Sequence, residues 1–245
     1  MKTTIKLLST ALASLILALP ASALSTEEAA ALAVRHHKAL EANRKVLSKF
    51  SPNYRIEMWE GDQLQWIDLV NVKIGSDGMP IITQINRDQV VESKRGIIGS
   101  GSQQRDFDKK DAIVGYALKW ILYYNRLPVD RLHTLFSKAS ADKAIVSAGS
   151  STNIIGVSAT NVRDSNANDS VSLWVNKVNG HPIRFAYTIP VEKTVEGYGG
   201  AAIDTVINYR YLDDGSAFYP DHIDVVIPTK KLYIKFENLN VLKKN

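Results

Sequence analysis

The sequence predicts an α+β fold in which helices cover the concave face of one strongly curved antiparallel sheet. Two stretches, Ser25–Phe50 and Asp106–Ala139, repeat their apolar residues at helical spacing. Most other stretches, above all Ala144–Asn245, alternate apolar and polar residues between turn signals. Long meanders of this kind curve strongly, and their concave side must be filled by side chains, helices or a ligand. Since no linker or internal repeat divides the chain, we expect one domain over residues 24–245.

Residues 1–23 are predicted to be a cleavable signal peptide. They combine two lysines near the start, an apolar run over Leu7–Leu19 and a small-x-small cleavage site at Ala21–Ala23. We therefore expect the mature protein to be exported. The chain has no cysteine, so we expect neither a disulfide nor a lipid attached to a cleavage-site thiol.

The charge of the chain limits its partners. Cleavage after Ala23 would remove two lysines and lower the formal net charge from +5 to +3. No run of lysines or arginines builds a nucleic-acid footprint, so we expect no nucleic-acid partner. Transient contact with an anionic membrane surface stays open, although scattered basic charge usually only aids solubility.

The first helix is expected to begin at Ser25 or Thr26, because either residue can cap it and two glutamates follow in the first turn. His36 and His37 are adjacent, and adjacent helical side chains point about 100° apart, so they are poorly placed to chelate one metal ion. We interpret them as surface or half-buried histidines. The apolar stripe consists of Leu32, His36, Ala39, Leu40, Val46 and Leu47.

Asn53–Asn86 is predicted to form three strands, the first of which presents Tyr54, Ile56 and Met58 on one face. Asp88–Arg105 is rich in glycine and does not lie between a strand and a helix, so it is no dinucleotide-binding fingerprint. We interpret it as a flexible loop that could serve as a hinge. The expected turns are Gly61-Asp62 and Ser76-Asp77-Gly78, and the second and third strands are Trp66–Ile74 and Met79–Ile85.

The second helical stretch is broken by Pro128, after which Val129–Lys138 starts a shorter helix. Its apolar stripe is broader than one contact with a sheet requires. A core-packing helix pair is the first interpretation and a lid over an apolar cavity is the second, because both use the same residues. The candidate lid residues are Ile113, Ala117, Trp120, Ile121, Tyr124, Leu132 and Phe136.

Val171–Ile189 is predicted to be a hairpin at the centre of the fold. Apolar and polar residues alternate strictly on both sides of Asn179-Gly180, a pair that tolerates the positive φ of a tight turn. Further strands are expected at Ile154–Val162, Ala202–Tyr211, Ser216–Ile227 and Lys231–Leu239, the last with Leu232, Ile234 and Phe236 inward.

We find no motif that carries catalysis. The five histidines have no metal-type spacing, and neither a nucleophile elbow nor a cofactor motif is present, so we expect no cofactor and no metal. Asp213-Asp214 precedes a glycine, which is typical of a tight turn rather than of a catalytic pair.

The C-terminal half resembles the LolA/LolB-like superfamily of periplasmic lipoprotein carriers. The resemblance rests on Leu173-Trp174, Gly180, Pro182 and Arg184, followed by Tyr209, Asp214-Gly215 and Pro220. It covers roughly the last third of the chain. It implies a half-open antiparallel β-barrel whose helices close an apolar cavity for acyl chains, and a periplasmic location.

We therefore expect a non-enzymatic carrier that binds a lipid, an acyl chain or a lipoprotein, with an envelope protein as a further partner. A cell-envelope hydrolase with an unrecognised triad and a protein-interaction module without a lipid ligand are the alternatives. In addition to the lid candidates, the sheet residues expected to line the cavity are Val175, Phe185, Tyr187, Ile234 and Phe236.

Overall fold

The computed structural model describes residues 24–74, 80–85, 90–94, 126–137, 154–162, 168–191, 193 and 197–243. Its helices are α1 (Thr26–Leu47), α3 (Val129–Ser137) and the short 3₁₀-helix η2 (Pro228–Lys230). Its strands are β1 (Phe50–Glu60), β2 (Gln63–Ile74), β3 (Pro80–Ile85), β4 (Val90–Lys94), β5 (Ile154–Thr160), β6 (Ser170–Asn176), β7 (Pro182–Pro190), β8 (Ala202–Tyr211), β9 (Phe218–Ile227) and β10 (Leu232–Lys243).

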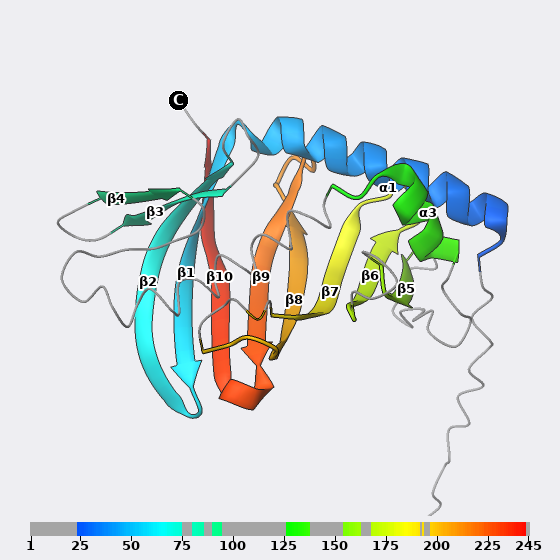
Figure 1. Cartoon of the computed structure of the whole chain (residues 1–245). Coiled ribbons are helices and arrows are strands. Elements are labelled where there is room, and N and C mark those ends of the chain that lie inside the picture. Colours follow the sequence, from blue (N-terminus) through cyan, green and yellow to red (C-terminus); the bar gives the residue numbers. More distant parts are fainter. Residues whose placement is uncertain are drawn as a thin grey trace, which may run out of the picture.

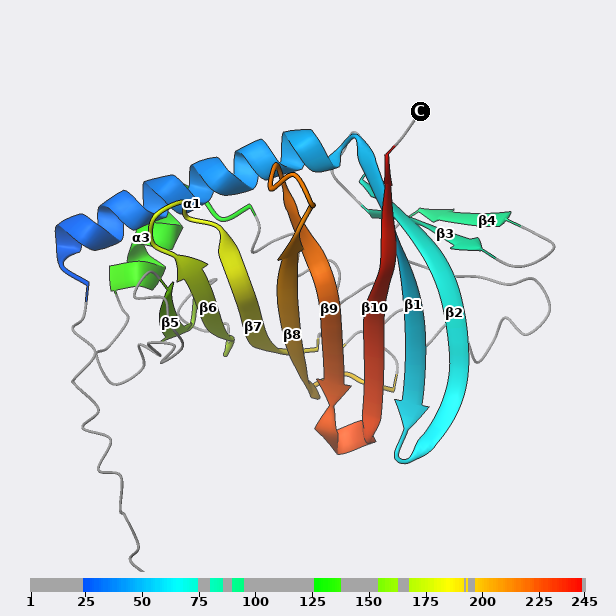
Figure 2. The ribbon, with the colours of Figure 1, turned by 180° about the vertical axis from the view of Figure 1, so that it is seen from behind.

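These ten strands form one antiparallel sheet in the order β4-β3-β2-β1-β10-β9-β8-β7-β6-β5. The sheet is curled and unclosed (Figures 1 and 2). Helix α1 runs across one end of the strands, and α3 lies below it beside β5 and β6. The predicted α+β class with a strongly curved antiparallel sheet is thereby confirmed.

Helix α1 begins where the sequence predicts. The Ser25 side chain accepts from the backbone N–H of Glu28, and the Glu28 carboxylate accepts from the N–H of Ser25. This capping box satisfies two amide groups that a helix start leaves without partners. The buried face of α1 consists of Ala29, Leu32, Ala33, His36, Ala39 and Leu40.

The inner face of the sheet carries a continuous row of buried apolar side chains. Each member pairs with the next on the adjacent strand, because antiparallel partners point to the same face. From β5 to β1 the row is Val157, Leu173, Phe185, Ile207, Ile223, Phe236 and Ile56. A second row beside it is Ala159, Val171, Tyr187, Thr205, Val225, Ile234 and Met58.

The central hairpin is present, and Asn179-Gly180 lies in the loop that joins its two strands. Asn176 and His181 close a four-residue loop, and within it only Gly180 has a positive φ, of 73°. A bulge then pairs Val175 with Pro182 and Trp174 with Arg184, which leaves Ile183 without a partner in the register and only half-buried. The positive φ expected at Asn179-Gly180 is therefore present at Gly180, whereas the predicted strict alternation fails at Ile183, because the bulge shifts the register by one residue.

The interpretation of Asp88–Arg105 as a flexible loop was wrong in part. Val90–Lys94 forms β4, which pairs with β3 at the sheet edge. Val90 and Val91 are β-branched and favour an extended backbone, which the glycine content around them obscured. The rest of that segment, its hinge, the signal peptide and the turn at residues 76–78 lie outside the described residues.

Candidate functional site

Two contacts on one face of α1 join this helix to the sheet. The His36 Nδ1 lies 2.6 Å from the carbonyl oxygen of Gly180, in the loop between β6 and β7. Seven residues further on, the Asn43 side chain bonds the backbone of Phe218, where β9 begins after the β8–β9 turn.

The spacing of these contacts matches the spacing of the strands. Seven residues of helix rise about 10.5 Å, and two strand separations span about 9.6 Å. The β6–β7 and β8–β9 turns are two strands apart at the same end of the sheet. A helix that crosses the strand ends can therefore meet one turn with His36 and the other with Asn43 (Figure 1).

Gly180 lets the helix backbone approach closely. A Cβ atom at this position would lie 2.7 Å from the carbonyl carbon of Arg35 and from the backbone nitrogen of His36. Real Cβ atoms do not come that close to backbone. The glycine therefore supplies both the positive φ of the loop and the space that α1 occupies.

The imidazole of His36 is neutral in the fold. Burial lowers its pKa to about 4, although the bond to Gly180 opposes this shift. A carbonyl oxygen can only accept, so the proton of the neutral ring lies on Nδ1 and Nε2 carries a lone pair. The ring of Phe136 on α3 meets it edge-on, with centroids 6.1 Å apart.

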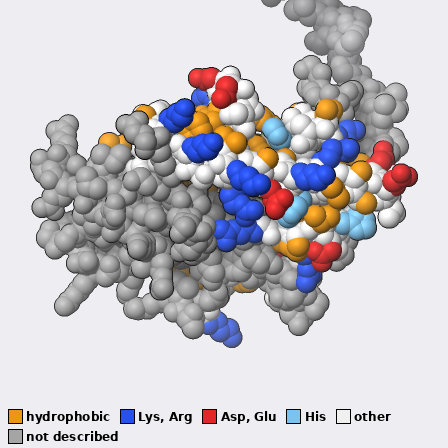
Figure 3. Space-filling view, turned by 90° about the horizontal axis from the view of Figure 1, so that it is seen from above, with side chains coloured by type: hydrophobic (Ala, Val, Ile, Leu, Met, Phe, Trp, Pro, Cys, Tyr) orange, Lys and Arg blue, Asp and Glu red, His pale blue; other side chains and the backbone are white. Residues whose placement is uncertain are grey.

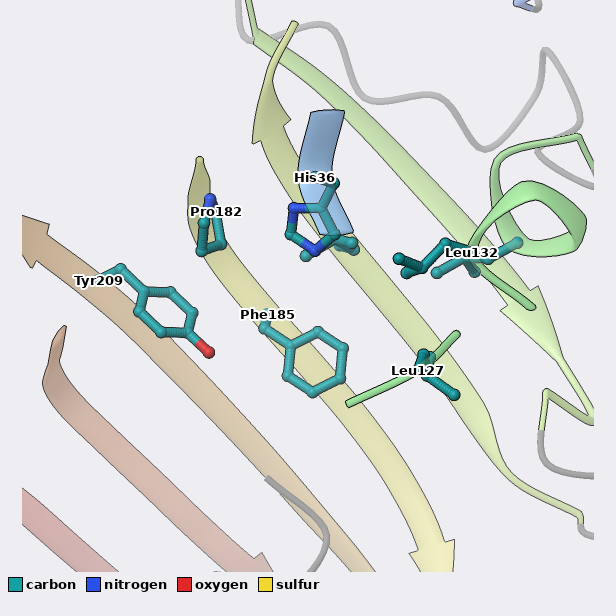
Figure 4. Close-up of a pocket in the computed structure, with 8 residues that line it drawn as sticks. His36, Leu127, Leu132, Pro182, Phe185 and Tyr209 are labelled. Carbon is teal, nitrogen blue, oxygen red and sulfur yellow. The ribbon is translucent and has the colours of Figure 1, made fainter. Parts of the chain in front are cut away.

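A small pocket lies between the two helices and the sheet, directly below His36 (Figure 4). Figure 4 shows the His36 ring above Phe185, with Tyr209 on one side and Leu127 and Leu132 on the other. The enclosed space is about the size of one water molecule, so an acyl chain does not fit in this arrangement. The lining residues are His36, Leu127, Leu132, Leu135, Leu173, Pro182, Phe185 and Tyr209.

The structure brings some of the predicted cavity residues to this pocket. Leu132 and Phe185 line it, and Phe136 lies beside it against His36. The sheet residues Val175, Tyr187, Ile234 and Phe236 are buried elsewhere on the sheet and do not line it. The other lid candidates, which lie outside the described residues, are Ile113, Ala117, Trp120, Ile121 and Tyr124.

Sequence reasoning missed Asn43 and the role of His36. His37 is half-buried as expected, but His36 is only 3% exposed and lines the pocket. The available signal was the spacing of seven residues between two polar side chains on the apolar face of α1. Asp214 accepts from the backbone N–H and hydroxyl of Ser216, which confirms its predicted role in a turn.

Within the described ranges, no cluster of side chains is arranged to hold a metal ion, and no histidine is hydrogen-bonded to a serine or threonine hydroxyl. In this part of the chain, no helix is long and apolar enough to cross a membrane. The outward side of α1 carries basic side chains toward its C-terminal half (Figure 3). They are Arg35, Lys38, Arg44 and Lys45, and each is exposed.

No family model and no curated protein matches this chain. Several solved structures are similar to it, including three from different organisms. A DUF1329 family protein from Desulfovibrio piger is 11% identical, with 89% of this chain and 92% of that chain covered and a TM-score of 0.39. A LolA superfamily protein from Nitrosomonas europaea is 11% identical, with 86% and 94% covered and a TM-score of 0.38.

The third similar structure is a domain classed with outer membrane lipoprotein-sorting proteins, from Vibrio parahaemolyticus. It is 7% identical, with 86% of this chain and 94% of that chain covered and a TM-score of 0.36. At these identities and TM-scores, the comparison assigns neither a ligand nor an activity to this chain.

Proposed function

We propose that this chain is a non-catalytic periplasmic carrier that binds an acyl chain, alone or as part of a lipid or lipoprotein, beneath α1 and α3. The observation that carries the proposal is the position of the pocket. It meets the first apolar row of the sheet at Leu173 and Phe185, and this row continues across the sheet to β1. An apolar surface of this length suits an unbranched hydrocarbon chain.

The energy of burial is sufficient for such a ligand. Each methylene removed from water contributes about 0.8 kcal/mol, so ten methylenes contribute about 8 kcal/mol, which corresponds to micromolar affinity before the costs of ordering. No charged anchor is required. This matches a lining in which His36 and Tyr209 are the only polar side chains among the described residues.

Binding requires the helices to move, because the closed pocket is too small. Helix α1 packs mainly on α3 and reaches the sheet mainly through turns at the strand ends. A joint shift of the helices would open the pocket, and it would separate Leu132 and Leu135 of α3 from the sheet residues with which they are now buried. The cysteine-free chain permits spin labels at Lys38→Cys on α1 and Val178→Cys in the β6–β7 loop, both exposed. We expect their separation to increase when ligand binds.

Two measurements test the function directly. Mass spectrometry of the gently extracted mature protein should find co-purifying lipid, and a fluorescent fatty-acid probe should bind with micromolar affinity. Leu173→Trp fills the pocket and should weaken probe binding at least tenfold, whereas Val178→Trp on the exposed loop should not. Absence of both lipid and probe binding would overturn the proposal.

A protein-interaction module is the second candidate, and one observation favours it. Leu64, Ile67 and Leu69 on β2 are each more than 40% exposed. Large apolar side chains that are grouped at a surface often mark a protein contact. If the double variant Ile67→Asp, Leu69→Asp lost capture of an envelope partner while wild-type protein bound no lipid, this function would replace the carrier.

A further inference from the structure

One side-chain nitrogen at the pocket, on the buried residue His36, can only accept a hydrogen bond. His36 Nδ1 donates to Gly180, so the lone pair on Nε2 is available. In the part of the chain that the structure describes, Nε2 has no hydrogen-bond partner, although the residue is only 3% exposed. In Figure 4 the ring points down into the space bounded by Phe185, Leu127 and Leu132.

The surroundings keep this atom an acceptor. The Phe136 ring on α3 lies perpendicular to the imidazole, and the nearby His37 and His181 disfavour a positive charge on His36. Tyr209, on the sheet side of the pocket, carries a hydroxyl that can donate or accept. All other lining side chains are those of leucine, proline or phenylalanine.

Building on the proposed carrier function, we propose that His36 Nε2 anchors the head of the ligand. The ligand then carries a hydrogen-bond donor, an amide N–H or a hydroxyl group, next to its acyl chain. An unpaired acceptor in an apolar site is costly, and a donor on the ligand removes this cost. A carboxylate would place its own acceptors against the lone pair and would lose its hydration, so it is the disfavoured head group.

Two matched probes isolate this hydrogen bond. N-methyldodecanamide has one N–H, whereas N,N-dimethyldodecanamide has none and carries one more methyl group. Apolar burial alone would make the dimethyl amide the tighter ligand. We expect the N-methyl amide to bind about tenfold tighter, and dodecanoate to bind more weakly than either amide.

The variants assign the preference to one side chain. In His36→Leu the two amides should bind equally, whereas the adjacent His37→Leu should keep the tenfold preference. His36→Leu also loses the bond to Gly180 and could fail to fold. A second measurement therefore uses the wild-type protein: the imidazole Nε2 resonance in ¹⁵N NMR should shift with the N-methyl amide and not with the dimethyl amide.

The outcomes separate the two proposals. Equal binding of both amides to the wild-type protein, or an unchanged Nε2 resonance, would overturn the role of His36 and leave the carrier function standing. Failure of both amides and of the fatty-acid probe to bind would overturn the carrier function, and this inference with it.

Discussion

The two contacts that join α1 to the sheet differ in how completely they are satisfied. At Asn43, the amide nitrogen donates to the carbonyl oxygen of Phe218 over 2.8 Å, and the amide oxygen accepts from the N–H of the same residue over 2.7 Å. At His36, one ring nitrogen is bonded to Gly180 and the other faces the pocket. Both polar atoms of the Asn43 amide thus bond the backbone at the start of β9. The His36 ring bonds the backbone with Nδ1 only, and its Nε2 faces the pocket.

This difference indicates that the Asn43 contact stabilises the fold and has no part in ligand binding. An asparagine amide that pairs with both backbone groups of one residue takes the place of the strand that β9 lacks there, so both polar atoms of the amide are bonded to the fold. A buried imidazole with an open lone pair is costly for the fold alone. The loop that His36 contacts holds Gly180, where the α1 backbone would lie within 3 Å of an added Cβ atom.

The largest expected effect is that of Gly180→Ala. The added Cβ would overlap the α1 backbone and would adopt a φ of 73°, so we expect a loss of about 4 kcal/mol in the free energy of unfolding. Gly215→Ala is the matched control, because its φ is 68° and a Cβ there meets no atom within 4 Å. It should cost about 1 kcal/mol. If urea denaturation showed equal losses of unfolding free energy for the two variants, the α1 backbone would not be in close contact with the loop at Gly180.

The second effect concerns pH. The pKa of His36 is about 4 in the fold and 6.5 in the unfolded chain, so the unfolded chain takes up the proton first as pH falls. The stability from the neutral ring is present above pH 6.5 and is lost between pH 6.5 and 4. We expect about 3 kcal/mol less stability at pH 4 than at pH 7, relative to His36→Gln.

The comparison with His36→Gln is necessary because a second histidine with a lowered pKa lies near this one. Burial lowers the pKa of His181 as well. Denaturation curves of both proteins at several pH values isolate the contribution of His36. Parallel pH profiles for the wild type and the variant would contradict a buried neutral imidazole.

The smallest expected effect is that of Asn43→Ala. It removes two hydrogen bonds to Phe218 and should cost about 2 kcal/mol of stability. Binding of the fatty-acid probe by the folded fraction should stay unchanged, because Asn43 does not line the pocket. A tenfold loss of probe affinity in a normally folded Asn43→Ala variant would contradict this expectation. It would mean that Asn43, like His36, contributes to ligand binding.

Features that depend on local chemistry could be predicted from the amino-acid sequence. The alternation in β1 predicts that Ile56 and Met58 point inward, and the cap at Ser25 predicts the start of α1. Pro128 correctly predicts where α3 begins, because proline fits the start of a helix and not its interior. Each of these predictions depends on neighbours within a few residues, so a single sequence contains the necessary information.

The position of α1, and the choice of its polar residues that face the sheet, depend on contacts between distant parts of the chain. His36 and Gly180 are separated by 144 positions, and Asn43 and Phe218 by 175. No local pattern encodes such pairs, because their geometry depends on the curl of the sheet and on the order of strands between them. The tautomer of His36 follows from one of these contacts, so the acceptor in the pocket could not be predicted from the helix alone.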